Sequence, residues 1–211
     1  MKKIFSICFC LLFLMNVAFS QDWKYGVALG VTNANYLLDN VKSGVSRSTS
    51  STFNGHVSGW VTLSPSRYFG VETGASVMGL GATLKTSEFG KREVQQHTYW
   101  LQVPVNVVGK LPLADSSSFF LKAGGYVGFG LFGKNYVPSS YSGSAKQEFL
   151  FGSGGTQKGL DLGWTLNLGY KLKSGYLINL GYQRGLKDLA PDNASYEQRN
   201  RAYTIGVGYE F

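Results

Sequence analysis

Cysteine is scarce in this chain, since the only two, Cys8 and Cys10, lie within the first twenty residues. If that segment is removed on export, the mature chain has no disulfide, no thiol nucleophile and no cysteine-ligated metal. Long hydrophobic runs are also missing after residue 20, where no stretch reaches the ~18 consecutive apolar residues that a membrane-spanning helix needs. Any passage of the remaining chain through a membrane therefore requires strands closed into a barrel, because only closure pairs every backbone group.

The first segment has the pattern of a cleaved export signal. Lys2 and Lys3 precede an apolar run over 4–18 that is too short to cross a bilayer. We expect cleavage after Ser20, which divides the chain into a signal peptide, 1–20, and one domain, 21–211. Of the 20 Lys and Arg residues two leave with the leader, so 18 remain against 12 Asp and Glu, a net charge of +6. An exported chain with this charge is expected to meet anionic lipid headgroups and not nucleic acid.

Eight stretches of the mature chain alternate between apolar residues and small or polar ones, which is the period of a β-strand with two different faces. The clearest is the stretch with Tyr99, Leu101, Val103, Val105 and Val107 on one face, and the stretch from Leu160 to Lys171 alternates almost without error. Three links between the stretches are short, 64–67, 112–117 and 173–175, and four are long, 38–51, 79–95, 133–158 and 186–200. Short periplasmic turns and longer extracellular loops are typical of bacterial outer-membrane β-barrels.

The sequence therefore predicts an all-β fold: an eight-stranded antiparallel transmembrane barrel with up-and-down topology, in the outer membrane, with both mature termini periplasmic. Outward aromatic residues gather near the predicted strand ends, as in the girdles of lipid-facing barrels. The periplasmic girdle would contain Trp23, Tyr25, Phe69, Phe119, Tyr170, Tyr176, Tyr209 and Phe211, and the outer one Phe53, Tyr99, Trp164, Tyr182 and Tyr203. A soluble barrel of lipocalin type also alternates, but it explains neither the girdles nor the link lengths.

Glycine is spread through the predicted strands instead of being gathered in linkers. Small inward residues let the walls of a narrow barrel close over bulky neighbours, and Trp60 is predicted to point inward as one of those neighbours.

Several motifs, in their order and spacing, resemble the PorT-like outer-membrane β-barrel domain family over 23–211. They include Tyr99-Trp100-Leu101-Gln102-Val103-Pro104-Val105, Leu160-Asp161-Leu162-Gly163-Trp164, Leu168-Gly169-Tyr170, and Leu180-Gly181-Tyr182-Gln183-Arg184-Gly185-Leu186. The C-terminal segment from Gly206 to Phe211 looks like the assembly signal of such barrels. The resemblance implies that Val207, Tyr209 and Phe211 are recognised by the barrel-insertion machinery. It implies fold and location more than activity, since members include secretion-system components and adhesins.

Six charged residues are predicted to face the interior. They are Lys24, Glu72, Lys122, Asp161, Lys171 and Glu210, three of each sign. An eight-stranded barrel is just wide enough for its own side chains to fill, so we expect these charges to pair as a polar plug, with Lys24 meeting Glu210 at the closing seam. The alternative is that they line a narrow ion path.

The long links carry an excess of basic residues that could form a collar facing the phosphates of lipopolysaccharide. The candidates are Lys91, Arg92, Lys134, Lys146, Arg199 and Arg201. A solvated rim without a preferred ligand explains the same residues equally well.

No cofactor, metal or catalytic pattern accompanies the two histidines, so His56 is interpreted as an inward polar residue and His97 as a rim residue. The sequence favours a non-enzymatic protein with a structural or surface-interaction role, carried by four extracellular loops and contact with outer-membrane lipids. A narrow pore or secretion-system accessory is the second hypothesis, and an outer-membrane hydrolase is the third.

Overall fold

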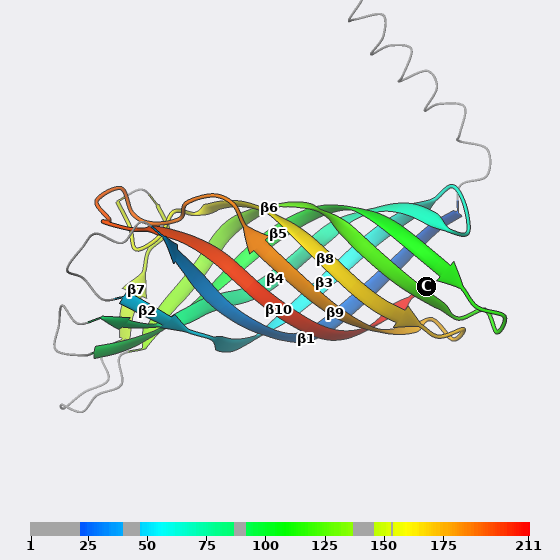
Figure 1. Cartoon of the computed structure of the whole chain (residues 1–211), viewed down its shortest axis with the longest axis horizontal. Helices are drawn as coiled ribbons and strands as arrows, with labels where there is room; N and C mark the ends of the chain where they lie inside the picture. Colours follow the sequence, from blue (N-terminus) through cyan, green and yellow to red (C-terminus); the bar gives the residue numbers. More distant parts are fainter. Residues whose placement is uncertain (1–21, 40–46, 87–91, 137–145, 153) are drawn as a thin grey trace, which may run out of the picture.

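The computed structural model describes residues 22–39, 47–86, 92–136, 146–152 and 154–211, which form a closed β-barrel (Figure 1). The predicted signal peptide lies outside the described residues. The strands are β1 (Asp22–Asp39), β2 (Arg47–Ser50), β3 (Thr52–Ser64), β4 (Phe69–Thr86), β5 (Arg92–Pro112), β6 (Ser118–Tyr136), β7 (Lys146–Phe149), β8 (Leu160–Lys171), β9 (Tyr176–Gly185) and β10 (Glu197–Glu210). None of the described residues forms a helix long and apolar enough to cross a membrane.

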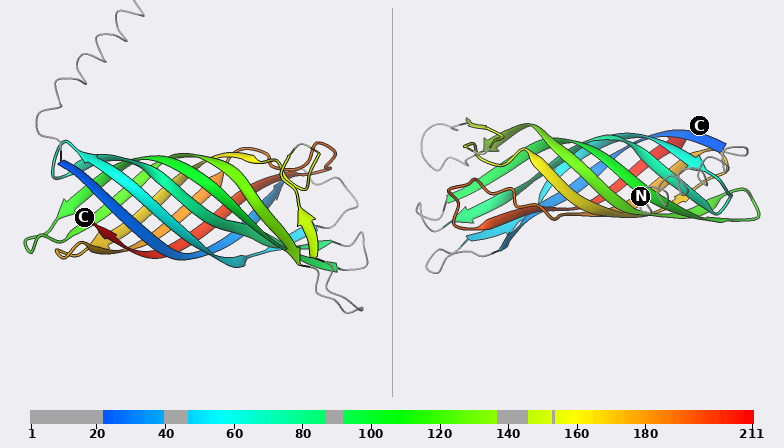
Figure 2. Two further views of the ribbon diagram at one scale, coloured as in Figure 1. Left: turned by 180° about the vertical axis from the view of Figure 1, so that it is seen from behind. Right: turned by 90° about the horizontal axis from the view of Figure 1, so that it is seen from above.

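Eight of these strands close a ring in the order β1, β3, β4, β5, β6, β8, β9, β10, and β10 returns to pair with β1. Every neighbouring pair is antiparallel, and the short strands β2 and β7 pair with β4 and β6 at one end of the ring. The three short turns and the C-terminus lie together at the opposite end (Figures 1 and 2). The predicted eight-stranded antiparallel barrel is confirmed.

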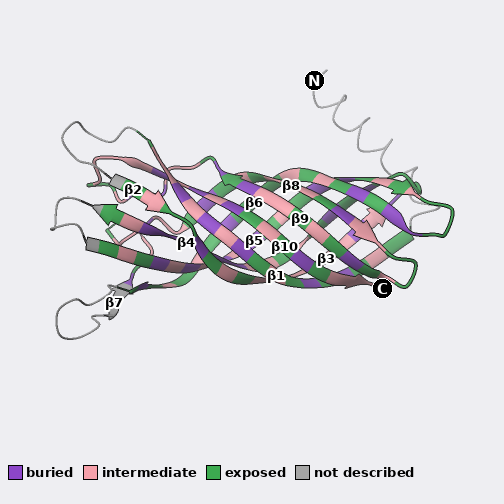
Figure 3. Cartoon of the chain, turned by 60° about the horizontal axis from the view of Figure 1, so that its bottom comes forward, coloured by how far each residue is buried: buried purple, intermediate pink, exposed green. Residues whose placement is uncertain are grey.

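Alternating burial along the strands separates an outward apolar face from an inward one, as the alternating colours of Figure 3 show. On β8, Leu162, Leu166 and Leu168 are exposed, whereas Asp161 and Gly169, at the alternate positions, are buried. The large apolar side chains of the wall thus face outward, where a membrane removes them from water.

Outward aromatic rings contact one another at both ends of the wall, in all but one case, Tyr209–Phe211, across neighbouring strands. At the short-turn end the pairs are Phe119–Tyr170, Tyr176–Tyr209 and Tyr209–Phe211, and at the long-loop end they are Trp164–Tyr182, Tyr182–Tyr203 and Tyr99–Phe132. All have ring centroids between 4.7 and 5.2 Å apart. These contacts fall where the sequence predicted the two girdles.

The short turns are specified by local chemistry. Gly175 ends the β8–β9 turn at a φ of 91°, a conformation that favours glycine, and its N–H donates to the Leu172 carbonyl. In the β5–β6 turn, the hydroxyl and backbone N–H of Ser117 both donate to Asp115, and these hydrogen bonds hold the pKa of that carboxyl below its ordinary value.

Strands at the long-loop end are longer than predicted. The segment 79–95 was expected to be a link, yet β4 and β5 remain paired to Thr86 and Arg92. Likewise β1 and β10 remain paired to Asp39 and Glu197. The prediction ended these strands too early because their outward residues are no longer apolar beyond the expected outer girdle. Without apolar residues at every second position, the alternation that marks a strand disappears.

Inward glycines make room for inward rings, as predicted. A Cβ added at Gly26 would overlap the Trp60 ring, and one added at Gly169 would overlap Phe120. Trp60 points into the barrel, which confirms the predicted exception on β3.

Candidate functional site

An apolar layer closes the lumen near the long-loop end. Trp100, Leu80 and Leu189 have no exposed surface and pack together there, and Phe151 adds its ring edge-on to Trp100 with centroids 5.0 Å apart. Leu189 comes from the β9–β10 link and Phe151 from the β6–β8 link, so two of the long links fold back into the mouth. We call this cluster the outer apolar layer.

A second cluster, the inner apolar layer, closes the lumen nearer the short turns. It consists of Val108, Phe120 and Leu177, with Trp60 packed against it. The predicted plug was polar, whereas the two closing layers are built mainly from apolar inward side chains.

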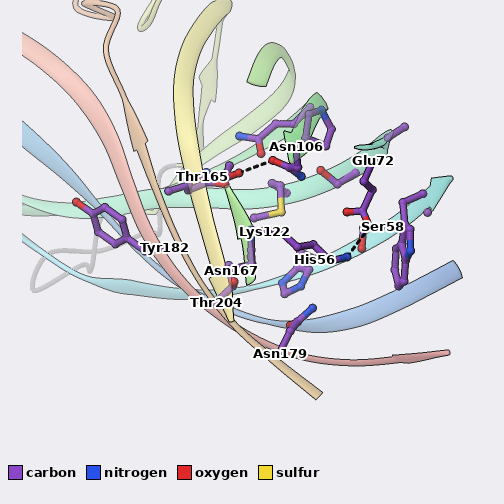
Figure 4. A pocket seen from close by; sticks show the side chains of 18 residues that line it. His56, Ser58, Glu72, Asn106, Lys122, Thr165, Asn167, Asn179, Tyr182 and Thr204 are labelled. Carbon is purple, nitrogen blue, oxygen red and sulfur yellow. Dashed lines mark hydrogen bonds and ion pairs between the residues drawn. The ribbon is translucent and has the colours of Figure 1, made fainter. Parts of the chain in front are cut away.

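A polar chamber of about 110 Å³ lies between the two layers (Figure 4). Successive inward residues of β5 show the arrangement, since Trp100 belongs to the outer layer, Gln102 and Asn106 line the chamber, and Val108 belongs to the inner layer. A water molecule needs roughly 10–15 Å³, so the chamber is large enough for several. Such waters would satisfy the side-chain N–H groups of Gln102 and Gln183, which have no partner among the described residues.

The Glu72–Lys122 ion pair forms the floor of this chamber, where Figure 4 shows both side chains. Lys122 Nζ lies 2.6 Å from Glu72 Oε2, and the two side chains are only 11% and 7% exposed. The Thr62 hydroxyl donates to the same carboxylate oxygen at 3.0 Å, and the ammonium lies 4.6 Å from the Trp60 ring centroid. Each charge is therefore paired and further stabilised by its neighbours.

Three of the other predicted inward charges, Lys24, Lys171 and Glu210, lie at the short-turn end and differ in their partners. Lys171 pairs with Glu210 at the short-turn end. The predicted Lys24–Glu210 contact is wrong: Lys24 Nζ instead lies 3.4 Å from Asp22 Oδ2. The reason is the seam register, in which Gly26 is the residue opposite Glu210, so Lys24 lies beyond the last β1–β10 pair.

Asp161 is buried without a cation. Its Oδ2 accepts hydrogen bonds from the Tyr126 hydroxyl at 3.0 Å and from Asn200 Nδ2 at 2.8 Å, while its Oδ1 has no partner among the described residues. No ion pair to Asp161 occurs within the described part of the chain. The expectation that all six inward charges pair with one another therefore does not hold for this residue.

Each histidine contacts a neutral side chain. His56 Nδ1 lies 3.1 Å from the Thr32 hydroxyl, and His97 Nδ1 lies 2.6 Å from Asn54 Oδ1. Among the described residues, no group of three or more His, Cys, Asp or Glu side chains could hold a metal ion. Within the described ranges, neither imidazole has the carboxylate partner that orients a catalytic base in a triad.

The predicted basic collar is only partly described. Lys91 lies outside the described residues, and the side chains of Arg92 and Lys146 are not described although their strands are. Lys134 is exposed. Arg199 is engaged by two carboxylates, with NH1 2.5 Å from Asp39 and NH2 against Glu197.

Arg201 lies in direct cross-strand register with Arg184, which the sequence interpretation did not single out. Both face outward two residue pairs beyond Tyr182 and Tyr203, and Arg184 lies directly opposite Trp164 of β8. Neither has an ion-pair partner within the described residues. Alternation along β9 is the signal that could have placed Arg184 on this face.

The C-terminal residues run along the closing seam. Val207 and Tyr209 face outward on β10, and the backbone N–H of Phe211 donates to the Tyr25 carbonyl at 2.8 Å. The Phe211 side chain is 72% exposed and lies against Tyr209.

Comparison with known proteins supports the barrel assignment. A sequence model of the family described as "Outer membrane protein beta-barrel domain" matches residues 19–190. This family places the barrel in a bacterial outer membrane, and it is broader than the PorT-like group, for which the comparisons give nothing specific. A comparison with curated protein sequences finds no match.

Several solved structures are similar to this chain. OprG from Pseudomonas aeruginosa has a TM-score of 0.56 and 12% identity, covering 90% of this chain and 97% of its own. Ail of Yersinia pestis, in complex with the heparin analogue sucrose octasulfate, has a TM-score of 0.46 and 12% identity, covering 90% and 99%. Neisserial surface protein A has a TM-score of 0.43 and 9% identity, covering 91% and 99%. At such identity, the likeness to OprG shows the fold alone.

Proposed function

Because the chain belongs to the outer membrane protein β-barrel domain family, we propose that it is a non-conducting, non-enzymatic barrel whose long-loop end makes contacts at the cell surface. In this proposal the short turns and both mature termini are periplasmic, because bacterial outer-membrane barrels carry short periplasmic turns and longer extracellular loops.

Closure of the lumen at two levels is the observation that carries the proposal. A solute would have to pass Trp100, Leu80 and Leu189, all without exposed surface, and then the Val108, Phe120 and Leu177 layer. An eight-stranded barrel leaves little space beyond its own side chains, so these layers oppose a continuous water path.

The paired strands beyond the outer girdle supply a surface for contacts. Seven residue pairs follow the girdle on β4 and β5, from Leu80↔Thr98 to Thr86↔Arg92. At ~3.4 Å per residue and a strand tilt of about 40°, they extend roughly 18 Å along the barrel axis. Ion pairs such as Lys85–Glu93, at 2.8 Å, cross this extension. A paired, polar rim of this length supports recognition outside the membrane.

Lipopolysaccharide phosphate is the partner proposed for Arg184 and Arg201. Like charges directly opposite each other on neighbouring strands are destabilising unless an anion lies between them. These two face outward just beyond aromatic rings, at the level where headgroups begin. Charge-assisted hydrogen bonds from both guanidinium groups to one phosphate would offset their repulsion.

Single-channel conductance of the refolded mature protein, residues 21–211, in a planar lipid bilayer tests the closed lumen. We expect no open steps from protein whose heat-modifiable gel mobility shows that it is folded. Reproducible open steps would reject the proposal and favour the narrow-pore alternative. A PorT-like role beside a secretion apparatus remains compatible with a silent barrel, and loss of secretion on deletion of the gene would favour it.

A further inference from the structure

A second cavity, separate from the chamber, occupies the mouth of the barrel at the short-turn end. Its volume is about 370 Å³, and we call it the basic cup. Its cations come from four places in the fold: Lys24 on β1, Arg67 in the β3–β4 turn, Lys110 on β5 and Lys171 on β8. Asp22 is the one acidic residue in its lining. The volume is within the range of small-molecule sites.

The cup has a closed floor. Val108, Phe120 and Leu177 of the inner apolar layer lie beneath it, beside the Lys171–Glu210 pair. The space that remains at this level is only about 10 Å³, enough for one water molecule at most. The cup is therefore a blind pocket and not the entrance of a channel.

Lys110 is a partly buried cation of the cup. Its Nζ donates to Ser64 Oγ at 2.8 Å, and no carboxylate of the described residues lies within ion-pair distance. Its side chain is only partly exposed, so part of its hydration is lost, and Glu210 and Glu72 act on it only from beyond ion-pair distance. An anion in the cup would restore the missing partner.

Two of the three neighbouring cations, Lys24 and Arg67, are also incompletely neutralised. Lys24 has only the exposed Asp22 carboxylate, at 3.4 Å, whereas Lys171 is neutralised by Glu210. Arg67 lies over the Tyr68 ring, 4.7 Å from its centroid, and has no carboxylate partner among the described residues.

We propose that the basic cup binds a soluble anion carrying a carboxylate or phosphate group, with Lys110 as the central donor and Lys24 and Arg67 at the rim. The lining residues face the lumen or lie on the turns, so the cup opens along the barrel axis and not toward lipid. The inference rests on the proposed function only for its location in the periplasm.

The test is a titration of the folded mature barrel in zwitterionic micelles, followed by backbone amide NMR shifts. Inorganic phosphate and acetate are the probes, each added at constant ionic strength set with chloride. We expect saturable shifts at Ser64, Lys110 and Lys171. Lys110→Met should weaken binding about tenfold, as expected for loss of one charge-assisted hydrogen bond.

Lys173→Met is the matched control, because this substitution removes the same charge at the same end of the barrel. Lys173 is exposed and does not line the cup. Heat-modifiable mobility verifies that both variants fold. Linear shifts without saturation, or equal weakening in the two variants, would overturn the inference by showing only diffuse charge attraction. Shifts produced by anionic phospholipid in the micelle, but by neither soluble probe, would overturn the choice of a soluble ligand. A silent barrel without saturable binding would reject the cup alone, whereas a conducting barrel with saturable binding would reject the proposed function alone.

Discussion

Replacing Glu72 by glutamine tests whether the lumen behaves as a protein interior. The substitution keeps the shape of the side chain and removes its charge. It leaves the Lys122 ammonium, whose side chain is 11% exposed, facing the rings of Trp60 and Phe120 without a counter-charge.

The expected loss in the free energy of unfolding is about 3 kcal/mol. Removal of one partner from a buried ion pair costs about 3–5 kcal/mol, because the other charge remains buried and unpaired. Lys122 also borders the polar chamber, whose waters would solvate the ammonium in part, so the lower end of the range applies. The matched control is Glu93→Gln. Its partner Lys85 lies 2.8 Å away, but both side chains are 48% exposed, and an exposed pair contributes about 0–1 kcal/mol.

The assay is equilibrium urea unfolding of barrels refolded into lipid vesicles, followed by tryptophan fluorescence. Adding Lys122→Met to Glu72→Gln should recover much of the lost stability, since it removes the orphaned charge. Equal small losses for Glu72→Gln and Glu93→Gln would show that water screens the lumen as it screens the surface, and would refute the argument.

Three further predictions use other parts of the barrel. Gly26→Ala should lower the free energy of unfolding by about 1–3 kcal/mol because the new Cβ overlaps the Trp60 ring. The control Gly109→Ala should be nearly neutral, since the atom nearest to its new Cβ is 3.9 Å away. Equal effects of the two substitutions would contradict the packing argument. Phe211→Ala should lower the amount of assembled barrel in cells without preventing folding in micelles, since the ring is 72% exposed; normal cellular assembly would reject the predicted signal. The double variant Arg184→Gln/Arg201→Gln should weaken the affinity for lipopolysaccharide, measured from the thermal stabilisation that the lipid produces, about tenfold. The control Lys173→Gln, at the opposite end, should leave this affinity unchanged, and equal affinities for the two variants would reject the phosphate site.

Period-two alternation was enough to predict the barrel, because a wall between lipid and a packed lumen imposes opposite chemistry on successive residues. Leu160 to Lys171 matched β8 in full. The same signal fails at the rim, where the outward face meets water and becomes polar while inward residues such as Leu80 and Ala82 are buried and apolar. For that reason β4 and β5 extend through the segment 79–95, which alternation had assigned to a link.

The interior was harder to predict, because the inner face was expected to be mainly polar or small, with Trp60 as an exception. Trp100, Val108 and Leu177 are apolar and inward. Alternation places them on the inner face, but which of them meet as a closing layer depends on the shear that aligns the strands. The same shear decides which charges meet. Register at the seam separates Lys24 from Glu210, while Lys122 and Glu72, fifty residues apart in the chain, are brought together.

Asp161 provides the converse test of charge in the lumen. Its carboxylate has no cation partner among the described residues. Ionisation therefore costs desolvation energy that no attraction to an opposite charge offsets. Asp161→Asn keeps an oxygen that accepts from Tyr126 and Asn200 and removes the charge, so it should leave the free energy of unfolding unchanged or raise it. Asp161→Leu removes the acceptor and should cost about 1–3 kcal/mol for each donor left unpaired. Urea unfolding in vesicles compares the two. If Asp161→Asn were as destabilising as Asp161→Leu, the carboxylate would have to be stabilised by a cation that the described strands do not supply. The account of this half of the lumen would then be wrong.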